Sequence, residues 1–138
     1  MNVLIDTNVV LDYLLRREHN YANALNIIAL SETGKLTGFI SASAVTDIFY
    51  IIRKEYKSRS IAIEQLKKLM RMVHAAAVSD NDIHEALELG WQDFEDAVQY
   101  VSGRNVMVEY IITRNAQDFG AADAEVVTPE EFLDKFII

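Results

Sequence analysis

Short apolar runs alternate along the chain with longer segments in which apolar residues recur at helical spacing. The runs that predict strands cover residues 3–5, 37–40, 75–78, 107–112 and 125–127. The helical spacing predicts helices over 9–17, 20–33, 41–52, 58–73, 80–89, 93–102 and from 129 onward. Because strands and helices alternate, the pattern predicts an α/β fold with helices covering a parallel sheet. The helices on either side of residue 57 are close in sequence, which predicts a helical hairpin.

Length and composition narrow the possibilities. The 138 residues predict a single domain over 1–138, and an apolar fraction of 51% is enough for a sizeable core. Cysteine is absent, which excludes a disulfide framework, a thiolate nucleophile and Cys-ligated zinc. The net charge of -8 excludes binding to nucleic acid through overall positive charge. We find no leader pattern and no long apolar stretch, so we expect a cytoplasmic protein without a membrane partner.

Polar side chains follow two of the predicted strands directly. Asp6 and Asn8 come after the first strand, and Thr113, Asn115 and Asp118 come after the strand that ends near residue 112. Open parallel sheets bind ligands at the carboxyl ends of their strands, so both groups are candidates for a site. The alternatives are that Asp6 caps the next helix and that the later group hydrogen-bonds its own loop.

Further acidic residues fall on predicted helices. Asp47 interrupts an apolar helix, where a buried ionised carboxylate would need a hydrogen-bonded partner, a shifted pKa or a metal. The alternative is that Asp47 faces solvent on a narrow polar strip. Asp93 and Asp96 are three residues apart and can share one face of a first helical turn, where acids also stabilise free backbone N–H groups.

These acids can converge at one edge of the sheet. Carboxylates held close together repel one another, so they either bind protons or are neutralised by divalent cations. Oxygen ligands favour Mg²⁺ or Mn²⁺ over zinc. One or two such ions can activate water and stabilise charge on a phosphodiester, so that no protein nucleophile is required.

In order and spacing, the motifs resemble the PIN domain family, metal-dependent ribonucleases that include the toxins of many bacterial toxin–antitoxin pairs. The segments that carry the resemblance are Asp6-Thr7-Asn8, Asp93-Phe94-Glu95-Asp96-Ala97, and Thr113-Arg114-Asn115 followed by Asp118-Phe119. The resemblance implies a three-layer α/β/α fold with a mainly parallel five-stranded sheet and an acidic pocket at the central strand ends. Two positions depart from the family, because Asp47 stands where Glu is common and Asn115 is neutral where some members carry an acid.

The resemblance also implies roles for these residues. Mg or Mn would be bound by Asp6, Asp96 and Asp118, with Asp47 acting directly or through water and Asp93 near a second, weaker ion. The residues expected to orient ligands and water are Asn8, Thr113 and Asn115. The catalytic set is therefore expected to be Asp6, Asp47, Asp96 and Asp118.

A basic window offsets the acidity locally. The window between positions 53 and 71 carries about +5 and leaves about -13 elsewhere. Its basic residues are Arg53, Lys54, Lys57, Arg59, Lys67, Lys68 and Arg71. We expect this surface to contact RNA phosphates, although such residues also serve solubility alone. Tyr50 and Tyr56 either stack on bases or pack in the hairpin, and Trp91 either anchors a turn or contacts a partner.

The acidic motifs and the resemblance to the PIN domain family together imply a Mg- or Mn-dependent ribonuclease that acts as the toxin of a bacterial toxin–antitoxin pair. A small antitoxin is expected to cover an apolar groove and the acidic pocket, and the toxin is expected to form a homodimer. The main alternative is a catalytically silent PIN-like module that binds RNA or protein. A further alternative is metal-dependent hydrolysis of another phosphate substrate, since a fold does not determine its substrate.

Overall fold

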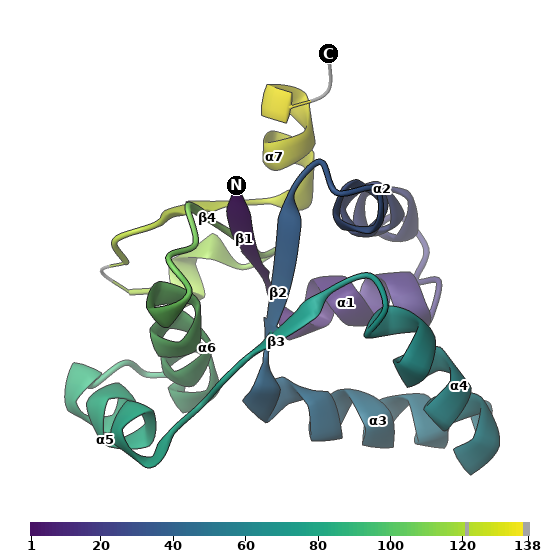
Figure 1. Ribbon diagram of the computed structural model, residues 1–138, viewed down its shortest axis with the longest axis horizontal. Coiled ribbons are helices and arrows are strands. Elements are labelled where there is room, and N and C mark those ends of the chain that lie inside the picture. Colours follow the sequence, from purple (N-terminus) through teal and green to yellow (C-terminus); the bar gives the residue numbers. More distant parts are fainter. Residues whose placement is uncertain (121, 137–138) are drawn as a thin grey trace.

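Five parallel strands form one sheet in the computed structural model, which describes residues 1–120 and 122–136 (Figure 1). The strands are β1 Asn2–Ile5, β2 Thr37–Ser41, β3 His74–Ala76, β4 Tyr110–Ile112 and β5 Glu125–Val127. Their order across the sheet is β3-β2-β1-β4-β5. The chain thus winds outward from β1 to β2 and β3, and then crosses to β4 on the other side of β1.

Helices cover both faces of this sheet. Those in the described part of the chain are α1 Thr7–Leu14, α2 Tyr21–Glu32, α3 Ala42–Tyr56, α4 Arg59–Leu69, α5 Asp80–Leu89, α6 Phe94–Asn105, the short 3-10 helix η1 Ala116–Asp118, and α7 Pro129–Phe136. Helices α1 to α4 and α7 pack on one face, whereas α5 and α6 cover the other (Figure 1). This arrangement confirms the predicted three-layer α/β/α fold with a five-stranded sheet.

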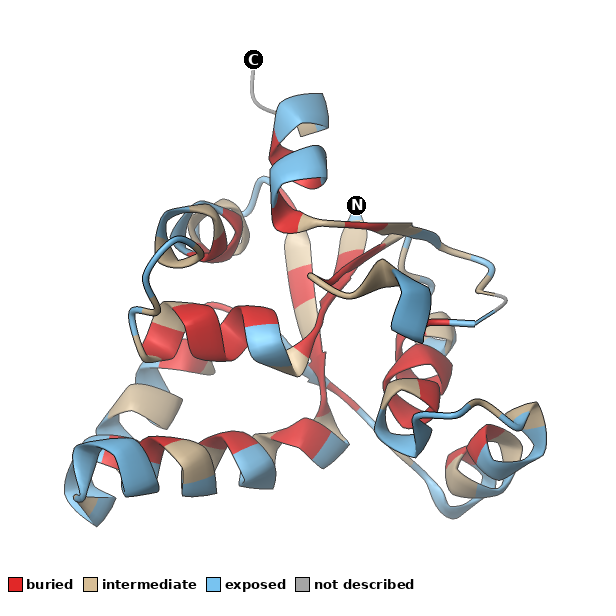
Figure 2. Cartoon of the chain, turned by 180° about the vertical axis from the view of Figure 1, so that it is seen from behind, coloured by how far each residue is buried: buried red, intermediate tan, exposed pale blue. Residues whose placement is uncertain are grey.

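The central strand β1 is buried on both faces, as expected of a parallel sheet between helical layers. Val3 and Ile5 pack in the core formed with α1 to α4 and α7, and Leu4 packs in the core beneath α5 and α6. Exposed residues lie on the outer sides of the helices (Figure 2). Burial of the apolar run Val3 to Ile5 fixes the central strand, and this strand places the next residue, Asp6, at the middle of the sheet edge.

Helices α3 and α4 form the predicted hairpin. Lys57 ends α3 in a left-handed conformation with φ of 52°, and Ser58 begins α4 by accepting a hydrogen bond from the Ile61 N–H at 3.2 Å. Because only these two residues join the helices, α3 and α4 pack side by side.

The strand predicted over 107–112 is wrong in its first half, since β4 begins only at Tyr110. Helix α6 is longer than predicted and ends in a turn that Val108 closes by donating its N–H to the Gly103 carbonyl at 3.2 Å. Met107 occupies the left-handed position of that turn, with φ of 56°, and is 80% exposed. An apolar residue in a helix-ending turn resembles the start of a strand when only hydropathy is read.

Four smaller boundaries also differ. The strand predicted over 75–78 is His74–Ala76, and the helix predicted over 41–52 continues to Tyr56. The helix predicted over 58–73 ends at Leu69, and the first helix ends at Leu14. Among the described residues, no helix combines the length and the apolar character needed to cross a bilayer.

Candidate active site

The carboxyl ends of β1 and β4 lie side by side where the winding of the sheet reverses. Asp6 follows β1 and donates its N–H to the Ile112 carbonyl at 3.0 Å, and Thr113 follows β4 and donates its N–H to the Val127 carbonyl at 2.9 Å. Backbone hydrogen bonds thus fix both residues at the sheet edge. The crevice outside such a reversal is where open α/β sheets bind their ligands.

Asp6 lies at the base of this crevice with only 5% of its surface exposed. Its Oδ2 accepts a hydrogen bond from the Thr113 hydroxyl at 3.0 Å, and its Oδ1 accepts one from Gln99 Nε2 at 3.1 Å. Burial raises the pKa of Asp6, and these two hydrogen bonds oppose the rise. Asp6 occupies the N-cap position of α1, as the capping alternative expected, but its side chain makes no capping hydrogen bond there, so capping does not account for the buried carboxylate.

Gln99 joins two of the acids and was not nominated from the sequence. Its Nε2 also donates to Asp96 Oδ1 at 3.2 Å, so one amide group bridges Asp6 and Asp96. The same side chain is 4% exposed, and its Oε1 has no hydrogen-bond partner among the described residues. Turning the amide over would point Oε1 at two carboxylates, so the bridge leaves a buried carbonyl oxygen unpaired.

Six carboxylates line one cavity of about 470 Å³ in front of Asp6. They are Asp6, Asp47, Asp93, Glu95, Asp96 and Asp118. Asn8, Thr113 and Asn115 line the same cavity. The structure therefore brings together every acid, amide and hydroxyl that the sequence nominated for the site, drawn from segments that are far apart in the chain. The polar side chains that line the cavity without having been nominated are Thr7, Glu95 and Gln99.

Burial and the closeness of other carboxylates raise the pKa of two acids in this cavity. The pKa of Asp96 is raised to about 7, first because the carboxyl is partly buried and then because Asp6 and other nearby carboxylates disfavour its ionised form. The pKa of Glu95 is also raised, chiefly by its hydrogen bond to Asp47. With a pKa of about 7, the Asp96 carboxyl holds a proton up to near neutral pH unless positive charge enters the cavity.

Three other acids of the cavity are exposed to solvent. Asp47 is exposed on α3, as the polar-strip alternative expected, yet it faces the cavity. Asp93 caps α6 by accepting a hydrogen bond from the Asp96 N–H at 3.0 Å, so its structural role is confirmed. Asp118 is exposed at the end of η1. These three side chains form an outer ring around the buried Asp6.

The donor set suits a hard divalent cation, although it is not assembled around one point. Within residues 1–120 and 122–136, no three acidic or histidine side chains are grouped closely enough to hold one ion as they stand. The Gln99 amide lies between Asp6 and Asp96, and the outer acids are exposed enough to rotate. With oxygen donors only, the residues fit Mg²⁺ or Mn²⁺ once these side chains turn inward.

A buried ion pair anchors the segment that carries Thr113 and Asn115. The guanidinium of Arg114 binds Asp12 on α1 through two hydrogen bonds, of 2.7 Å and 3.2 Å, and Arg17 approaches the same carboxylate at 3.4 Å. Asp12 is 1% exposed, so its charge depends on these two arginines. This pair ties the strand end at β4 to the helix that follows Asp6.

The basic residues of the 53–71 window are all exposed, and none of them forms an ion pair within the described part of the chain. Four of them line a shallow hollow of about 480 Å³ with Tyr50 and Ser58, and we call these four the basic rim: Arg53, Lys54, Lys57 and Arg59. Tyr50 also lines the acidic cavity, so the rim adjoins it.

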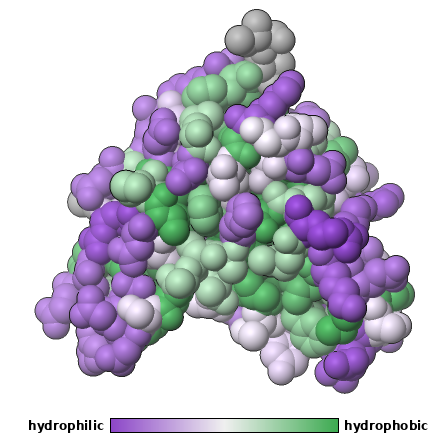
Figure 3. Space-filling model, in the orientation of Figure 1, coloured by the Kyte–Doolittle hydropathy of each residue, from purple (hydrophilic) through white to green (hydrophobic). Residues whose placement is uncertain are grey.

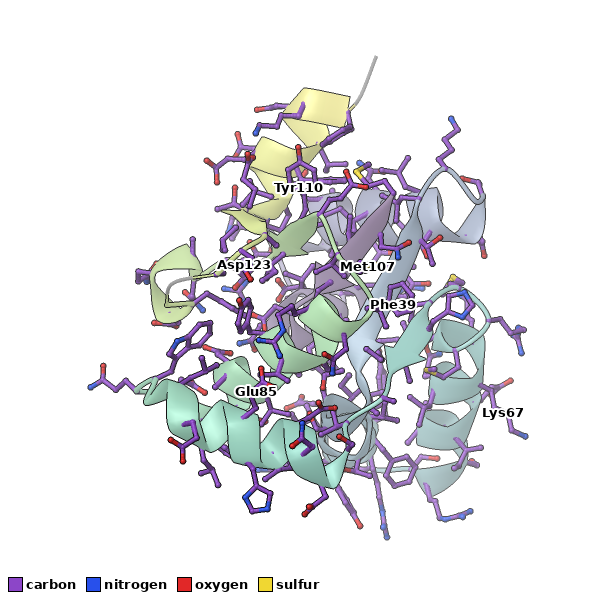
Figure 4. All side chains as sticks on the ribbon, turned by 60° about the vertical axis from the view of Figure 1, so that its left-hand side comes forward. Phe39, Lys67, Glu85, Met107, Tyr110 and Asp123 are labelled. Carbon is purple, nitrogen blue, oxygen red and sulfur yellow. The ribbon has the colours of Figure 1, made fainter. Side chains whose placement is uncertain are left out.

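The remaining three, Lys67, Lys68 and Arg71, lie at or beyond the end of α4 and line neither of these two hollows. Figure 4 shows Lys67 on the opposite side of the molecule from Glu85 of α5. The surface view shows hydrophilic residues gathered over α5 and more hydrophobic ones over the strands (Figure 3). Because only four of the seven basic residues line the hollow beside the acidic cavity, the predicted basic surface is divided, and only the basic rim borders the site.

The two tyrosines of the hairpin behave differently. Tyr50 is 63% exposed, so the alternative that it packs in the hairpin core is wrong. Tyr56 donates its hydroxyl to the Leu14 carbonyl at 2.9 Å and thereby ties α3 to α1. Of the two, Tyr50 is free to meet a ligand that spans the rim and the cavity.

Known proteins resemble this chain in sequence and in fold. The sequence model of the PIN domain family matches residues 2–117. The chain is 25% identical to "Ribonuclease VapC1" of Aquifex aeolicus (strain VF5), over 97% of this chain and 94% of that protein. It is similar to a structure described as a toxin-antitoxin complex from Klebsiella pneumoniae, with a TM-score of 0.65, 26% identity, and coverage of 92% of this chain and 97% of that one.

A further structural neighbour is VapBC2 from Rickettsia felis bound to a promoter DNA fragment, with a TM-score of 0.67 and 14% identity over 92% of this chain and 97% of that one. At that identity the likeness concerns the fold alone. The family match spans both strand ends, the central acidic segment and most of the sheet. The chain belongs to the PIN domain family.

Proposed function

We propose that this protein is a Mg²⁺- or Mn²⁺-dependent endoribonuclease that acts as the toxin of a toxin–antitoxin pair. The observation that carries the proposal is the cluster of six carboxylates, the buried Asp6 and five others, in one cavity at the reversal point of the sheet. Membership of the PIN domain family and similarity to a ribonuclease support the same activity.

The proposed metal ligands are Asp6, Asp96 and Asp118, with Asp47 direct or through water and Asp93 beside a second ion. A bound divalent cation would activate water and stabilise negative charge on the phosphodiester. Hydrogen bonds from Thr113 and Gln99 hold both carboxylate oxygens of Asp6 in place before any cation binds. Asn8 and Asn115 line the cavity and would orient water or ligand oxygens.

The basic rim is the proposed binding surface for RNA phosphates. Its four residues are exposed beside the cavity, so a single strand can contact them while a neighbouring phosphate enters among the carboxylates. Two of the four, Arg53 and Lys54, also lie in the last turn of α3, where positive charge stabilises the helix end. The exposed ring of Tyr50 would stack on a base between the two regions.

A small antitoxin is the proposed protein partner, supported by the likeness to the toxin–antitoxin complex from Klebsiella pneumoniae. The chain offers a hollow of about 370 Å³ between the α1–α2 and α3–α4 pairs, lined by Tyr13, Tyr21 and Tyr56. Residues of α1 and α3 line both this hollow and the acidic cavity, so an antitoxin segment that covers both would run along these two helices. Homodimer formation remains a prediction.

The activity has a direct test. Purified protein should cleave single-stranded RNA in Mg²⁺ or Mn²⁺ and stop in EDTA, and Asp6→Asn or Asp96→Asn should abolish cleavage with circular dichroism unchanged. Asp134→Asn, which removes an exposed acid from α7, is the matched control and should cleave normally. Cleavage that persists in EDTA and in both site variants would overturn the proposal.

The same samples distinguish the silent-module alternative. A working site should gain thermal stability from Mg²⁺ or Mn²⁺ by mass action, and Asp6→Asn should lose that gain. A protein that binds RNA, is not stabilised by either cation and cleaves no RNA would be a binding module instead.

A further inference from the structure

A second hollow opens beside the acidic cavity and has no part in the function proposed above. Its volume is about 550 Å³, and the connection between α5 and α6 and the segment after β4 line it: Trp91, Gln92, Asp93, Phe94, Gln117, Asp118 and Gly120. Two of these residues, Asp93 and Asp118, also line the acidic cavity. A ligand centred among the carboxylates therefore extends naturally into this space, which we call the Trp91 hollow.

The indole of Trp91 is held in a fixed position in this hollow. It stacks on Tyr100 with ring centroids 5.0 Å apart and meets Phe119 edge-on at 6.0 Å. The backbone of Gly120 passes so close that a Cβ at that position would lie 2.7 Å from the indole nitrogen. Three neighbours thus fix the ring, while part of it remains exposed. The alternative that Trp91 anchors the turn is borne out by these contacts, but they leave its exposed part unexplained.

The wall of the hollow also carries an exposed aromatic side chain. Phe94 begins α6 and is 43% exposed although it is apolar. An exposed aromatic side chain and a partly exposed tryptophan in one hollow are typical of surfaces that stack on planar ligands. Gln92 and Gln117 are exposed in the same hollow and offer both hydrogen-bond donors and acceptors.

The charge of the hollow decides which part of an RNA would enter it. Its charged residues are the two carboxylates shared with the cavity, and these repel phosphate. A nucleobase carries no charge, has two aromatic faces for Phe94 and Trp91, and presents edge groups to the glutamine amides. Exocyclic amino groups of adenine, cytosine and guanine can also donate to a carboxylate oxygen of Asp93 or Asp118 that holds no cation, whereas uracil has no such group.

We propose that the Trp91 hollow is a nucleobase subsite that receives the base next to the scissile phosphate and favours bases with an exocyclic amino group. This inference rests on the proposed ribonuclease function, because it takes the acidic cavity as the place of cleavage. The cavity then lies between two kinds of contact: the basic rim holds phosphates on one side, and the Trp91 hollow holds a base on the other.

The chain contains a single tryptophan, so its fluorescence reports on this hollow directly. The probe is a set of short RNA oligonucleotides that differ in one base, mixed with the Asp6→Asn protein in Mg²⁺ so that they stay intact. We expect the amino-bearing bases to quench Trp91 fluorescence in a saturable way and more strongly than uracil. An oligonucleotide without a base at that position, and inorganic triphosphate, should leave the fluorescence unchanged.

Substitutions at the wall test the assignment. Phe94→Ala should weaken binding by about 5- to 100-fold, the usual effect of losing one base-stacking ring, and Phe94→Tyr should restore it. Leu87→Ala is the matched control, since Leu87 is an exposed apolar residue on α5 that does not line the hollow, and it should bind normally. In the otherwise unchanged protein, Phe94→Ala should also flatten the base preference at the cleavage position.

The outcomes separate this inference from the proposed function. RNA that is cleaved with Mg²⁺ while Trp91 fluorescence and Phe94→Ala show no effect would overturn the subsite and leave the ribonuclease intact. Base-dependent quenching that Phe94→Ala removes, in a protein that cleaves no RNA, would support the subsite and refute the ribonuclease. Quenching by triphosphate equal to that by RNA would overturn the subsite, because a phosphate site would explain it.

Discussion

Replacing Asp96 by asparagine removes a carboxylate whose ionised form is destabilised in the folded protein by burial and by nearby carboxylates. The pKa of Asp96 is raised from its ordinary value of 3.8 to about 7, so the folded state binds this proton more tightly than the unfolded state. Stability from this group is therefore complete below about pH 4 and is lost as the pH rises to about 7. An asparagine side chain carries no charge at any of these pH values, so the variant avoids that loss while its amide oxygen can still accept the Gln99 hydrogen bond.

The magnitude follows from the same numbers. A difference between 3.8 and about 7 corresponds to about 4 kcal/mol for a fully buried group. Asp96 is only partly buried, and solvent screens its repulsion, so we discount this to about 1–2 kcal/mol. We expect Asp96→Asn, without divalent cations, to be more stable than the unchanged protein by that amount at pH 8 and by nearly nothing at pH 4. The rise in Tm at pH 8 should be about 3–8 °C.

Urea denaturation in EDTA at pH 4, 6 and 8 measures the effect. Asp134→Asn controls for the loss of one negative charge from a chain of net charge -8, and its effect should be small and should show no step near pH 7. Lower stability of Asp96→Asn than of the unchanged protein at pH 8, or an equal difference between the two at pH 4 and pH 8, would refute this reasoning. Ionisation of Asp96 would then not destabilise the folded state. Adding Mg²⁺ or Mn²⁺ should stabilise the unchanged protein and reverse the order.

Other substitutions test separate parts of the site. Gln99→Glu should lower the Tm in EDTA, because it places another carboxylate between Asp6 and Asp96, and should enlarge the stabilisation by Mn²⁺ in differential scanning fluorimetry. Neutralising the four residues of the basic rim should weaken RNA binding and reduce the steepness of log K against log salt. At about 0.7 for each phosphate contact, the reduction should be about 3. Neutralising Lys67, Lys68 and Arg71 should leave the steepness unchanged. Arg114→Met should destabilise the fold by about 3 kcal/mol in urea, because it leaves the buried Asp12 with Arg17 alone; a loss below about 1 kcal/mol would show that Arg17 suffices.

The fold and the position of the site were predictable because both depend on short-range signals. Apolar runs that end in Asp6 or near Thr113 mark the carboxyl ends of strands, and parallel strands bring such ends to one edge. The helical hairpin was predictable from the few residues that separate two amphipathic segments. The beginning of β4 was not, because Met107 is apolar and its left-handed conformation leaves no mark in hydropathy.

The internal organisation of the site was less accessible to sequence. Gln99 lies three residues after Asp96, which places both on one helix face, but a single polar residue at that spacing is ordinarily solvated. Its role depends on Asp6, 93 residues away, and on the burial of that carboxylate. Glu95 was adjacent to nominated acids, yet only the position of α3 shows that it faces Asp47. Contacts between distant segments decide both cases.

The acidity of the chain and its proposed substrate are compatible because opposite charges are segregated in space. The carboxylates line one cavity whose charge falls when protons or cations enter, and the basic rim is exposed beside it without ion-pair partners among the described residues. Salt screens contacts at the rim far more than it screens groups in the buried part of the cavity. Affinity for RNA is therefore assigned to the rim and the Trp91 hollow, and cation-dependent chemistry to the ring around Asp6. The net charge of -8 describes neither the acidic cavity nor the basic rim, because these two regions contribute to it with opposite signs.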